Sequence, residues 1–397
     1  GTTGTLTSNS DFDLQSGSVS AILGGSFGVT KTTALGTVTL SGANTYTGAT
    51  AVNAGVLNLQ HATAAGTTAG GVTVAGGAAL ELQGGIAVGN EALSIAGSGI
   101  GGNGALRNIS GNNTWGGTVT MASAATIQSD ANALTLNAAN AVTGAAQDLT
   151  LGGAGNGTIG GTITTTTGVL TKSGAGTWTL SGANAYTGTT TVNAGTLAYG
   201  ASNVIFTGAV TVDGATAVLA LGNNQSDSVG TVTVDNGGSI TGTGTSSLTS
   251  TGTFEMKSGA VSAILAGAGV ALNKTTGGIV TLSGANTYTG ITKISAGTLS
   301  VATIGNGGVA GNLGAATAAA GNLVLDGGTL QYTGLTAATD RGFTLTGGKT
   351  SSIDVTANNL TLSSAVPATT GALTKSGAGT WTLSGANTYT GTTTVNA

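Results

Sequence analysis

The amino-acid sequence predicts an all-β protein folded as a parallel β-solenoid. The stretch LTKSGAGTWTLSGANAYTGTTTVNA at Leu170–Ala194 returns at Leu373–Ala397 with a single difference. Apolar and hydroxyl side chains also alternate in short runs that end at glycine or asparagine, as in half-buried strands that meet at corners. Recurrence of one such unit indicates a repeat architecture. Copies of the unit occupy residues 29–57, 170–197, 272–299 and 373–397.

The spacing of the copies predicts the number of coils. The serine that opens each SGAN corner is Ser41, Ser181, Ser283 or Ser384, at intervals of 140, 102 and 101 residues. A coil of roughly 20 residues divides these intervals into about seven, five and five turns. The chain would then form about 20 coils, roughly 95 Å long at about 4.8 Å per strand layer. We expect a single continuous solenoid over residues 1–397, because the composition does not shift along the chain.

The composition favours ordered strands over disorder. The 397 residues include 74 glycines but one proline, no cysteine, 9 basic and 13 acidic residues. Disordered chains are usually rich in proline and charge, and central strands exclude proline. No basic cluster is present, so we expect no nucleic-acid partner. No run of about 18 apolar residues occurs, so we expect no membrane insertion of this segment.

Within the repeat, each piece of sequence predicts one element. Trp178 and Leu180 alternate with hydroxyls in Thr177–Ser181, which predicts a strand with these two side chains inward. Gly182–Asn184 supplies a corner, because glycine and asparagine tolerate a left-handed backbone. The alternation then resumes through Val192 and turns again after Asn193.

The connecting segments follow the same logic. Phe254 lies 242 positions after Phe12 (254 − 12), and the core motif repeats at the same offset, so residues 6–57 and 248–299 form one duplicated block. Phrases such as TVTVDNGGSITGTG from Thr231 consist of a strand, a glycine-containing corner and a strand. Such a corner is either a hairpin turn or the bend between faces of one coil. Repetition at coil length favours the coil.

The common text LTKSGAGTWTLSGANxYTGxTTVNAGTL resembles the autotransporter-associated β-strand repeat. In the copies that begin at Thr37 and Ile279, Val38 and Val280 replace the tryptophan. The resemblance implies a right-handed parallel β-helix in a secreted passenger of Gram-negative bacteria, at the cell surface. The matching residues are Lys172, Gly174, Gly176, Trp178, Leu180, Ser181, Gly182, Asn184, Tyr186, Gly188, Val192, Asn193, Gly195 and Leu197.

We assign a structural motif and expect no catalytic, cofactor-binding or metal-binding residue. Trp178 and Trp381 could offer carbohydrate-stacking faces, but their strand parity predicts an inward position. Thr-x-Thr phrases resemble the arrays of ice-binding solenoids, yet they do not show coil spacing on one face. The structural motif comprises Trp178, Leu180, Gly182, Asn184, Tyr186, Val192, Asn193, Trp381, Leu383, Gly385, Asn387 and Tyr389.

The alternative function is a carbohydrate-active β-helix enzyme. Glycoside hydrolysis needs two carboxylates about 5 to 9.5 Å apart, and only Asp11 and Asp13 share a strand face. We interpret them as an exposed strand surface, because the other acids are dispersed along the sequence. An enzyme would gather its acids on neighbouring coils.

Other candidate sites have structural interpretations. His61, the single histidine, has no acid nearby in sequence and is expected in a solvated loop. Residues 152–159 resemble a calcium-binding nonapeptide, but Gly157 stands where the aspartate is needed. Asp340 and Arg341 are expected to form a surface ion pair of little energetic weight.

These observations predict a structural extracellular solenoid: a bacterial surface fibre, spacer or adhesin stalk without catalysis. Its expected partners are a host or surface glycan or protein receptor. The last copy stops at Val395–Ala397, where the others continue with Gly-Thr-Leu or Gly-Val-Leu, and the chain begins at Gly1 without a polar cap. We therefore expect continuation in a longer chain or end-to-end self-association, because open solenoid ends leave strands unpaired.

Overall fold

The computed structural model describes residues 4–396, and its regular secondary structure is almost entirely short β-strands joined by turns and loops. They form a parallel β-solenoid of about 19 turns, which confirms the predicted fold class. The chain divides into two compact units, Gly1–Phe206 and Thr207–Ala397. A single continuous solenoid over residues 1–397 stays a prediction. The terminal positions 1–3 and 397, on which the prediction about the chain ends partly depends, lie outside the described residues.

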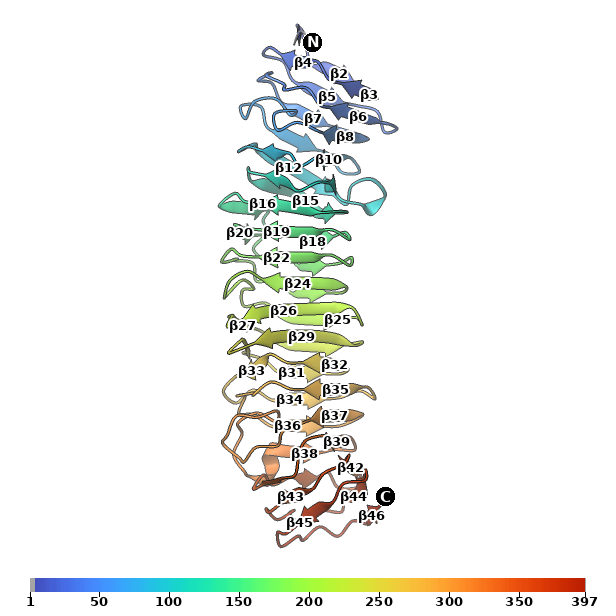
Figure 1. The fold of residues 1–397 in the computed structure, drawn as a ribbon, viewed down its shortest axis with the longest axis vertical. Helices are drawn as coiled ribbons and strands as arrows, with labels where there is room; N and C mark the ends of the chain where they lie inside the picture. The colour runs from blue at the N-terminus through green and yellow to red at the C-terminus, as the bar shows by residue number, and fades with distance from the viewer. Residues whose placement is uncertain (1–3, 397) are drawn as a thin grey trace. The chain divides into compact units, whose positions relative to one another are not determined.

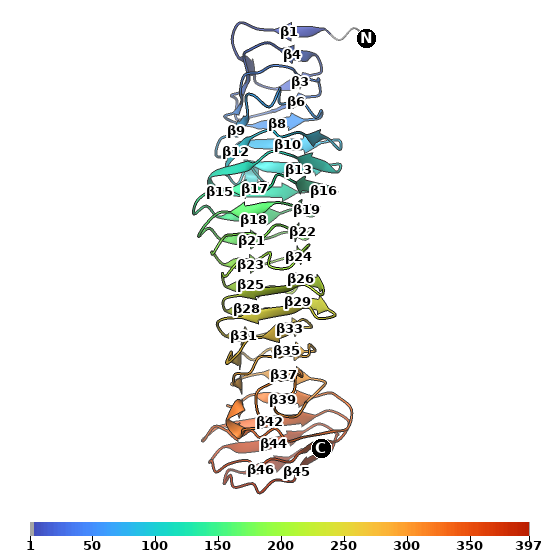
Figure 2. The same cartoon turned by 90° about the vertical axis from the view of Figure 1, so that its left-hand side faces the viewer.

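In unit 1, Gly1–Phe206, successive strands stack in layers (blue to green in Figures 1 and 2). The first sheet contains β2 (Phe12–Leu14), β3 (Gly17–Val19), β5 (Val29–Lys31), β6 (Thr37–Leu40), β7 (Thr50–Val52), β8 (Val56–Leu59), β9 (Val72–Val74), β10 (Ala79–Gln83), β12 (Leu93–Gly97), β13 (Leu106–Ser110), β15 (Val119–Ser129), β17 (Asn140–Thr143), β18 (Leu149–Gly152), β20 (Thr162–Thr164), β21 (Leu170–Lys172) and β23 (Thr190–Val192). The second contains β11 (Ala87–Val88), β14 (Asn113–Trp115), β16 (Ala133–Leu136), β19 (Asn156–Ile159), β22 (Thr177–Leu180) and β24 (Gly195–Tyr199); β1 (Thr5–Thr7) pairs with β4 (Ile22–Gly24).

In unit 2, Thr207–Ala397, the strands divide among four sheets. One sheet contains β25 (Val210–Asp213), β28 (Val232–Asp235), β31 (Phe254–Met256), β34 (Leu272–Lys274), β36 (Thr292–Ile294), β38 (Leu323–Leu325) and β41 (Thr344–Leu345). Another contains β26 (Ala217–Asn223), β29 (Gly238–Thr243), β32 (Gly259–Val261), β35 (Ile279–Leu282), β37 (Thr298–Val301), β39 (Thr329–Tyr332), β42 (Thr350–Val355), β44 (Ala372–Ser376) and β46 (Thr393–Val395). Two short sheets contain β27 (Ser226–Val229), β30 (Ser247–Ser250) and β33 (Ile264–Ala266), and β40 (Ala337–Thr339), β43 (Leu360–Leu362) and β45 (Trp381–Leu383).

The corners join faces of one coil and are not hairpins. Strand β28 pairs in parallel with β25 and β31 and not with β29, the next strand in sequence. Between β28 and β29 the backbone turns at Asn236 (φ 49°) and Gly237 (φ 85°), so the left-handed conformation is used at the bend. This confirms the coil interpretation of the Asp-Asn-Gly phrase.

Each unit has its core inside the coils, where side chains of successive turns stack. In β22, Trp178 lies opposite Gly157 of the preceding turn and Leu197 of the following one. The intervening threonines of β22 face outward and are partly exposed. The core is therefore a set of columns, each filled by the inward positions of consecutive turns.

In the described part of the chain, helical structure is confined to two single turns of 3₁₀ helix, η1 (Ile100–Gly102) and η2 (Ala320–Asn322). Within residues 4–396, no helix has the length and apolar character needed to cross a membrane.

Candidate functional site

The asparagines of three SGAN corners each join three consecutive turns. Asn184 is 4 % exposed. Its Oδ1 accepts a hydrogen bond from the Ile163 amide of the preceding turn at 2.7 Å, and its Nδ2 donates to the Val204 carbonyl of the following turn at 2.6 Å. The amide thus replaces ladder bonds that the corner backbone cannot make. Asn44 and Asn286 make the same pair of bonds, and Asn387 accepts from the Val366 amide.

A tyrosine and a threonine four residues apart form a second part of the motif. The Tyr186 Oη lies 2.8 Å from Thr190 Oγ1, inside the coil. This hydrogen bond satisfies two hydroxyls that burial removes from water. Burial also raises the pKa of the corresponding Tyr288 to about 12, so the phenol stays neutral. The pairs Tyr46–Thr50, Tyr288–Thr292 and Tyr389–Thr393 have the same contact.

The lysine of the repeat is buried and bound to backbone oxygens, a role that the sequence interpretation missed. The Lys172 Nζ donates to the carbonyls of Ser173 (2.8 Å), Gly174 (2.7 Å) and Ala194 (3.0 Å). Burial lowers the pKa of Lys172 to about 8. In the other copies the ammonium also binds corner backbone: Lys31 to Thr33, Lys274 to Thr276 and Ala296, and Lys375 to Gly377.

The glycines of the motif allow close contact between turns. A Cβ at Gly182 would overlap the carbonyl oxygen of Gly161, and one at Gly385 would meet the backbone of Ser364 and Ala365. Gly195 combines such an approach with φ of +62°. Side chains at these positions would separate the turns.

Trp178 fills the coil interior. It is fully buried, and its Nε1 donates to the Gly152 carbonyl at 3.0 Å. A Cβ at Gly157 would overlap the Trp178 ring, so the glycine that interrupts the calcium-type nonapeptide makes room for the indole. Trp381 is half-buried and lies 6.2 Å, centroid to centroid, from the ring of Phe343.

The remaining motif residues divide between core and surface. Leu180 and Val192 are fully buried, whereas Asn193 is exposed. The backbone N–H of Asn193 donates to the Lys172 carbonyl at 2.9 Å. In the fourth copy, Leu383, Gly385, Asn387 and Tyr389 are all half-buried.

The candidate acids and histidine serve local hydrogen bonds. Asp11 Oδ1 accepts from the Gly28 amide at 2.7 Å, and Asp13 Oδ1 accepts from Thr32 Oγ1 at 2.8 Å. Both acids are exposed. His61 is partly exposed, with Nδ1 3.2 Å from Thr63 Oγ1. Across residues 4–396, no group of three or more histidine or acidic side chains could hold a metal ion.

One ionic cluster combines residues that are far apart in sequence. Arg107 Nη1 lies 3.0 Å from Glu81 Oε1, and Arg107 Nε donates to Asp130 Oδ2 at 2.6 Å. Gln128 Nε2 donates to Asp130 Oδ1 at 2.6 Å, and Asn58 Nδ2 to Glu81 Oε2 at 3.4 Å. The expectation of dispersed acids is wrong here, because the sequence separations are close to one coil length. The pairing of Glu81 with Arg107, and of Arg107 with Gln128, brings the cluster together.

Two further expectations are corrected. Threonines do stack at coil spacing: Thr135 pairs with Thr114 and with Thr158, which pairs with Thr179, on the outward side of the second sheet of unit 1. The column follows from the pairing register of the strands, which the Thr-x-Thr phrases alone do not give. Its hydroxyls supply an uncharged polar surface.

Arg341 is not part of a surface ion pair with Asp340. It is 4 % exposed and donates to the backbone carbonyls of Gly305 (2.8 Å) and Gly314 (2.6 Å) in the loop that precedes η2. The Asp340 carboxylate instead accepts from the Gly307 amide at 2.7 Å. Sequence adjacency suggested the ion pair, but the two side chains bind different parts of the backbone in the loop before η2.

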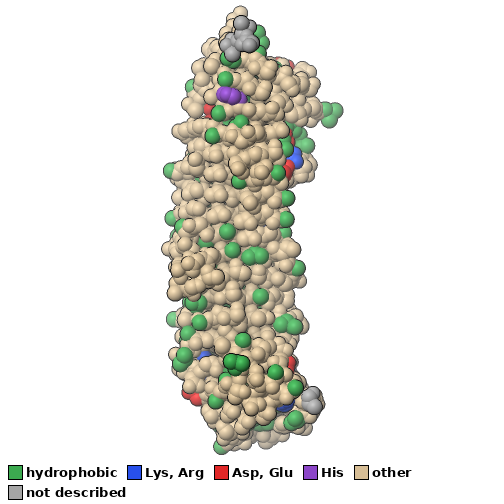
Figure 3. All heavy atoms as spheres, in the orientation of Figure 1, with side chains coloured by type: hydrophobic (Ala, Val, Ile, Leu, Met, Phe, Trp, Pro, Cys, Tyr) green, Lys and Arg blue, Asp and Glu red, His purple; other side chains and the backbone are tan. Residues whose placement is uncertain are grey.

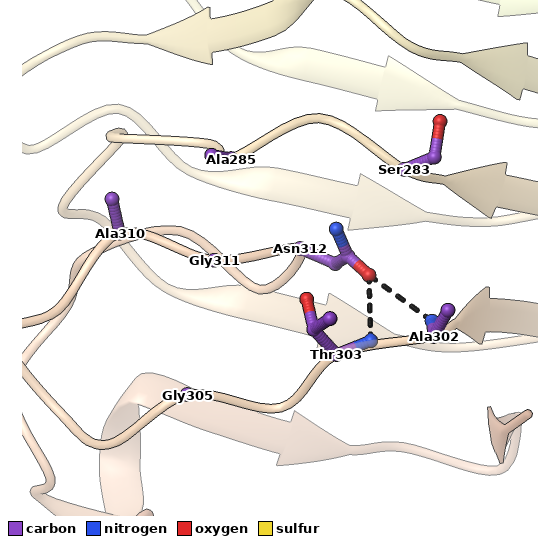
Figure 4. A pocket seen from close by; sticks show the side chains of 8 residues that line it. All are labelled: Ser283, Ala285, Ala302, Thr303, Gly305, Ala310, Gly311 and Asn312. Carbon is purple, nitrogen blue, oxygen red and sulfur yellow. Dashed lines mark hydrogen bonds between the residues drawn. The ribbon is translucent and has the colours of Figure 1, made fainter. Parts of the chain in front are cut away.

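The same loop borders a small cavity of about 380 Å³ (Figure 4). Asn312 Oδ1 accepts from the amides of Ala302 (3.0 Å) and Thr303 (2.8 Å), and Nδ2 donates to the Gly284 carbonyl (2.9 Å). The Asn312 amide is therefore engaged in holding the loop against the corner. The lining side chains are small and uncharged.

Comparisons with known proteins agree with this geometry. The passenger-associated-transport-repeat family model matches residues 30–59, 170–198, 272–301 and 373–397, the segments that carry the lysine, asparagine and tyrosine contacts. The chain is also 49 % identical over 125 residues to the adhesin BmaC autotransporter of Brucella suis biovar 1 (strain 1330). That alignment covers 31 % of this chain and 4 % of the relative, so the chain spans a small part of the relative's length. No solved structure matches the chain significantly.

The four family matches confirm the resemblance inferred from the repeat text. Passengers of this kind are displayed at the bacterial cell surface, which confirms the predicted location. The chain therefore carries four copies of the passenger-associated-transport repeat and resembles autotransporter passengers in these segments.

Proposed function

We propose that the chain is a stalk section of a surface adhesin. In this role it provides length and stiffness and does not act as a catalyst. The observation that carries this proposal is the recurrence of one set of inter-turn contacts in the repeat copies. Asparagine and lysine side chains bind the backbone of neighbouring turns in each unit. Because the polar side chains of the motif bind neighbouring turns, the motif acts to stabilise the solenoid.

These contacts would resist slippage of one turn past the next. Both hydrogen bonds of Asn184 need the preceding and the following turn in register, and a one-residue slip would turn inward side chains outward. Threonine columns such as Thr135–Thr158–Thr179 cover the outer face with hydroxyls and very little charge. Figure 3 shows this character on one face, where charged side chains are few.

The repeat text allows a direct test of the stalk role. Because residues 170–194 and 373–397 are nearly identical, residues 195–397 can follow Ala397 again without a change of register. We expect chains with one, two and three such copies to grow by about 50 Å per copy, from roughly ten turns at about 4.8 Å each. Electron microscopy of the purified chains measures this length. Particles that grow in width or clump, without growing in length, would contradict the stalk.

The partner of the proposed adhesin is a host or surface protein or glycan, in line with the adhesin name of the similar protein. To separate the two partner classes, the chain is displayed on beads and its binding to cell-surface extracts is measured before and after glycosidase treatment of the extracts. Loss of binding after treatment indicates a glycan, and unchanged binding indicates a protein. End-to-end self-association is the second proposed contact. Sedimentation over a hundredfold concentration range tests it, and a constant monomer mass would argue against it.

The competing hypothesis is a carbohydrate-active enzyme. Glu81 and Asp130 both contact Arg107, and Asp11 and Asp13 accept hydrogen bonds from Gly28 and Thr32. These contacts give the carboxylates structural partners. Release of reducing ends from bacterial or plant polysaccharides, abolished by Asp11→Asn or Asp13→Asn, would establish the enzyme and displace the stalk.

A further inference from the structure

A cavity of about 520 Å³ in unit 1 contains ionisable groups that the repeat motif does not use. Its lining comes from residues 43–45, 61–68 and 88–91. This volume is within the range of small-ligand sites. Small apolar side chains form part of the wall, and the ionisable lining residues are His61 and Glu91. The apolar side chains are Ala43, Ala62, Ala65 and Val88.

Glu91 lines this cavity with an unsatisfied carboxyl oxygen. The residue is 2 % exposed, and its Oε1 has no hydrogen-bond partner, as is also true of Thr67 Oγ1 in the same wall. The backbone amide of Gly71 binds the carboxyl group. None of the ion pairs of residues 4–396 includes Glu91. A buried carboxyl without a cation is costly when ionised, and burial raises the pKa of Glu91 to about 7.

This cavity has a counterpart in unit 2, from which it differs in its ionisable side chains. Ala285 and Thr303 line the cavity of Figure 4 at the 242-residue offset (285 − 43, 303 − 61) from Ala43 and His61. That second cavity has no ionisable side chain in its lining. The carboxyl group is thus a feature of the first cavity alone, and the second cavity forms without it.

We propose that this cavity binds a primary alkylammonium group, with the ammonium against the Glu91 carboxylate and the alkyl chain against the alanine and valine wall. A cation supplies the charge that the buried carboxylate lacks, and the ammonium protons can also reach Thr67 Oγ1. A single carboxylate is a poor ligand set for Ca²⁺ or Mg²⁺, which prefer several oxygen ligands. The ammonium can belong to a free amine or to a lysine side chain of another protein.

Two other titratable groups face this carboxyl. His61 lines the same cavity. Tyr46 interacts electrostatically with Glu91, and its pKa is raised by burial above the ordinary range, so it remains neutral. Binding of the ammonium should therefore strengthen from pH 5.5 to 8, as Glu91 ionises.

The experiment uses the full chain labelled with ¹³C at the glutamate carboxyl carbon, since Glu81, Glu91 and Glu255 are its three glutamates. We expect n-butylammonium to lower the titration midpoint of the Glu91 resonance by one pH unit or more and to leave the other two unchanged. Nα-acetyl-lysine methylamide tests the protein-borne source, and n-butanol is the neutral control. Binding of the lysine derivative assigns the site to lysine side chains, and binding of butylammonium alone assigns it to free amines.

Two variants keep the test decisive. Glu91→Gln removes the charge at nearly constant shape, and Ala62→Phe fills the cavity while keeping the carboxyl group. Both should weaken butylammonium binding at least tenfold at pH 8, whereas Glu81→Gln, in the Arg107 cluster, should not. Circular dichroism establishes that each variant is folded. Absence of binding to either ammonium compound, equal binding of n-butanol, or undiminished binding by folded Glu91→Gln would overturn the proposal.

Discussion

The ammonium of Lys172 and the backbone carbonyl of Ala194 lie 3.0 Å apart and join two successive turns of the solenoid. The lysine belongs to β21, and the alanine follows β23, which pairs with β21 in parallel. Two further carbonyls complete the coordination of the ammonium. A charged group has thereby become an internal connector that binds only backbone dipoles.

Replacing Lys172 with methionine should destabilise unit 1. The variant leaves the carbonyls of Ser173, Gly174 and Ala194 without their donor, at about 1–3 kcal/mol for each buried group that water cannot reach. The urea midpoint at pH 7 measures the loss. Lys349→Met, at an exposed lysine, is the control and should leave the midpoint unchanged.

The same lysine predicts how stability depends on pH. Its folded-state pKa is about 8, against an ordinary value of 10.5, so between these pH values the unfolded chain binds more protons. Stability should therefore rise with pH from 8 to 10.5, by up to about 3 kcal/mol from this group. Other groups also titrate in this range. The quantity to compare is therefore the slope of the free energy of unfolding against pH in the wild type minus the same slope in Lys172→Met. A difference of zero would contradict the lowered pKa.

Asn184→Ala should cost about 2–4 kcal/mol, because the Ile163 amide and the Val204 carbonyl both lose a buried partner. Hydrogen exchange should accelerate at Ile163 more than at distant amides of the unit. Asn156→Ala is a matched control: Asn156 also accepts from a neighbouring turn, at the Thr177 amide, but is exposed, so water can replace it. Equal losses in both variants would show that burial is not the cause.

Gly182→Ala should destabilise the solenoid by about 3 kcal/mol or more, because the added methyl group would overlap the Gly161 carbonyl. Gly76→Ala provides the comparison, since a Cβ there meets nothing within 4 Å and the backbone φ is not positive. That variant should be neutral or slightly stabilising. Thermal unfolding of the two proteins side by side measures the difference.

Glu91→Gln should stabilise the protein at pH 8 and have little effect at pH 4. The folded-state pKa of Glu91 is raised to about 7 from 4.5, so ionisation opposes folding and stability is lost as pH rises through this window. The free energy of unfolding should therefore fall less steeply between pH 4.5 and 7 in the variant than in the wild type. Asp148→Asn, at an exposed acid of the same unit, is the control. A larger gain at pH 4 than at pH 8 would be incompatible with the raised pKa.

Arg341→Lys should loosen the loop before η2. The guanidinium reaches Gly305 and Gly314 together, and a single ammonium cannot span both carbonyls in the same geometry. Limited proteolysis should cut the variant within residues 303–318 at a rate several times that of wild type. Cleavage spread evenly over unit 2 would instead indicate global destabilisation.

The sequence by itself determined the repeat, the strands and the coil corners. The alternation of Trp178 and Leu180 with threonine assigns an inward and an outward side, because strand side chains have a period of two. Gly182 and Asn184 mark a corner for equally local reasons. These features depend on neighbours in the chain, so a single sequence suffices to predict them.

Only the tertiary structure decided which residues meet across turns. Turn length varies: Trp178 lies 21 residues after its partner Gly157 and 19 residues before its partner Leu197 (178 − 157, 197 − 178). A fixed period therefore cannot place Glu81 and Asp130 against Arg107, nor Glu91 against the loop that carries His61. Strand register is set by the packing of whole coils, and the burial that shifts the pKa values of Lys172 and Glu91 exists only after the turns have stacked.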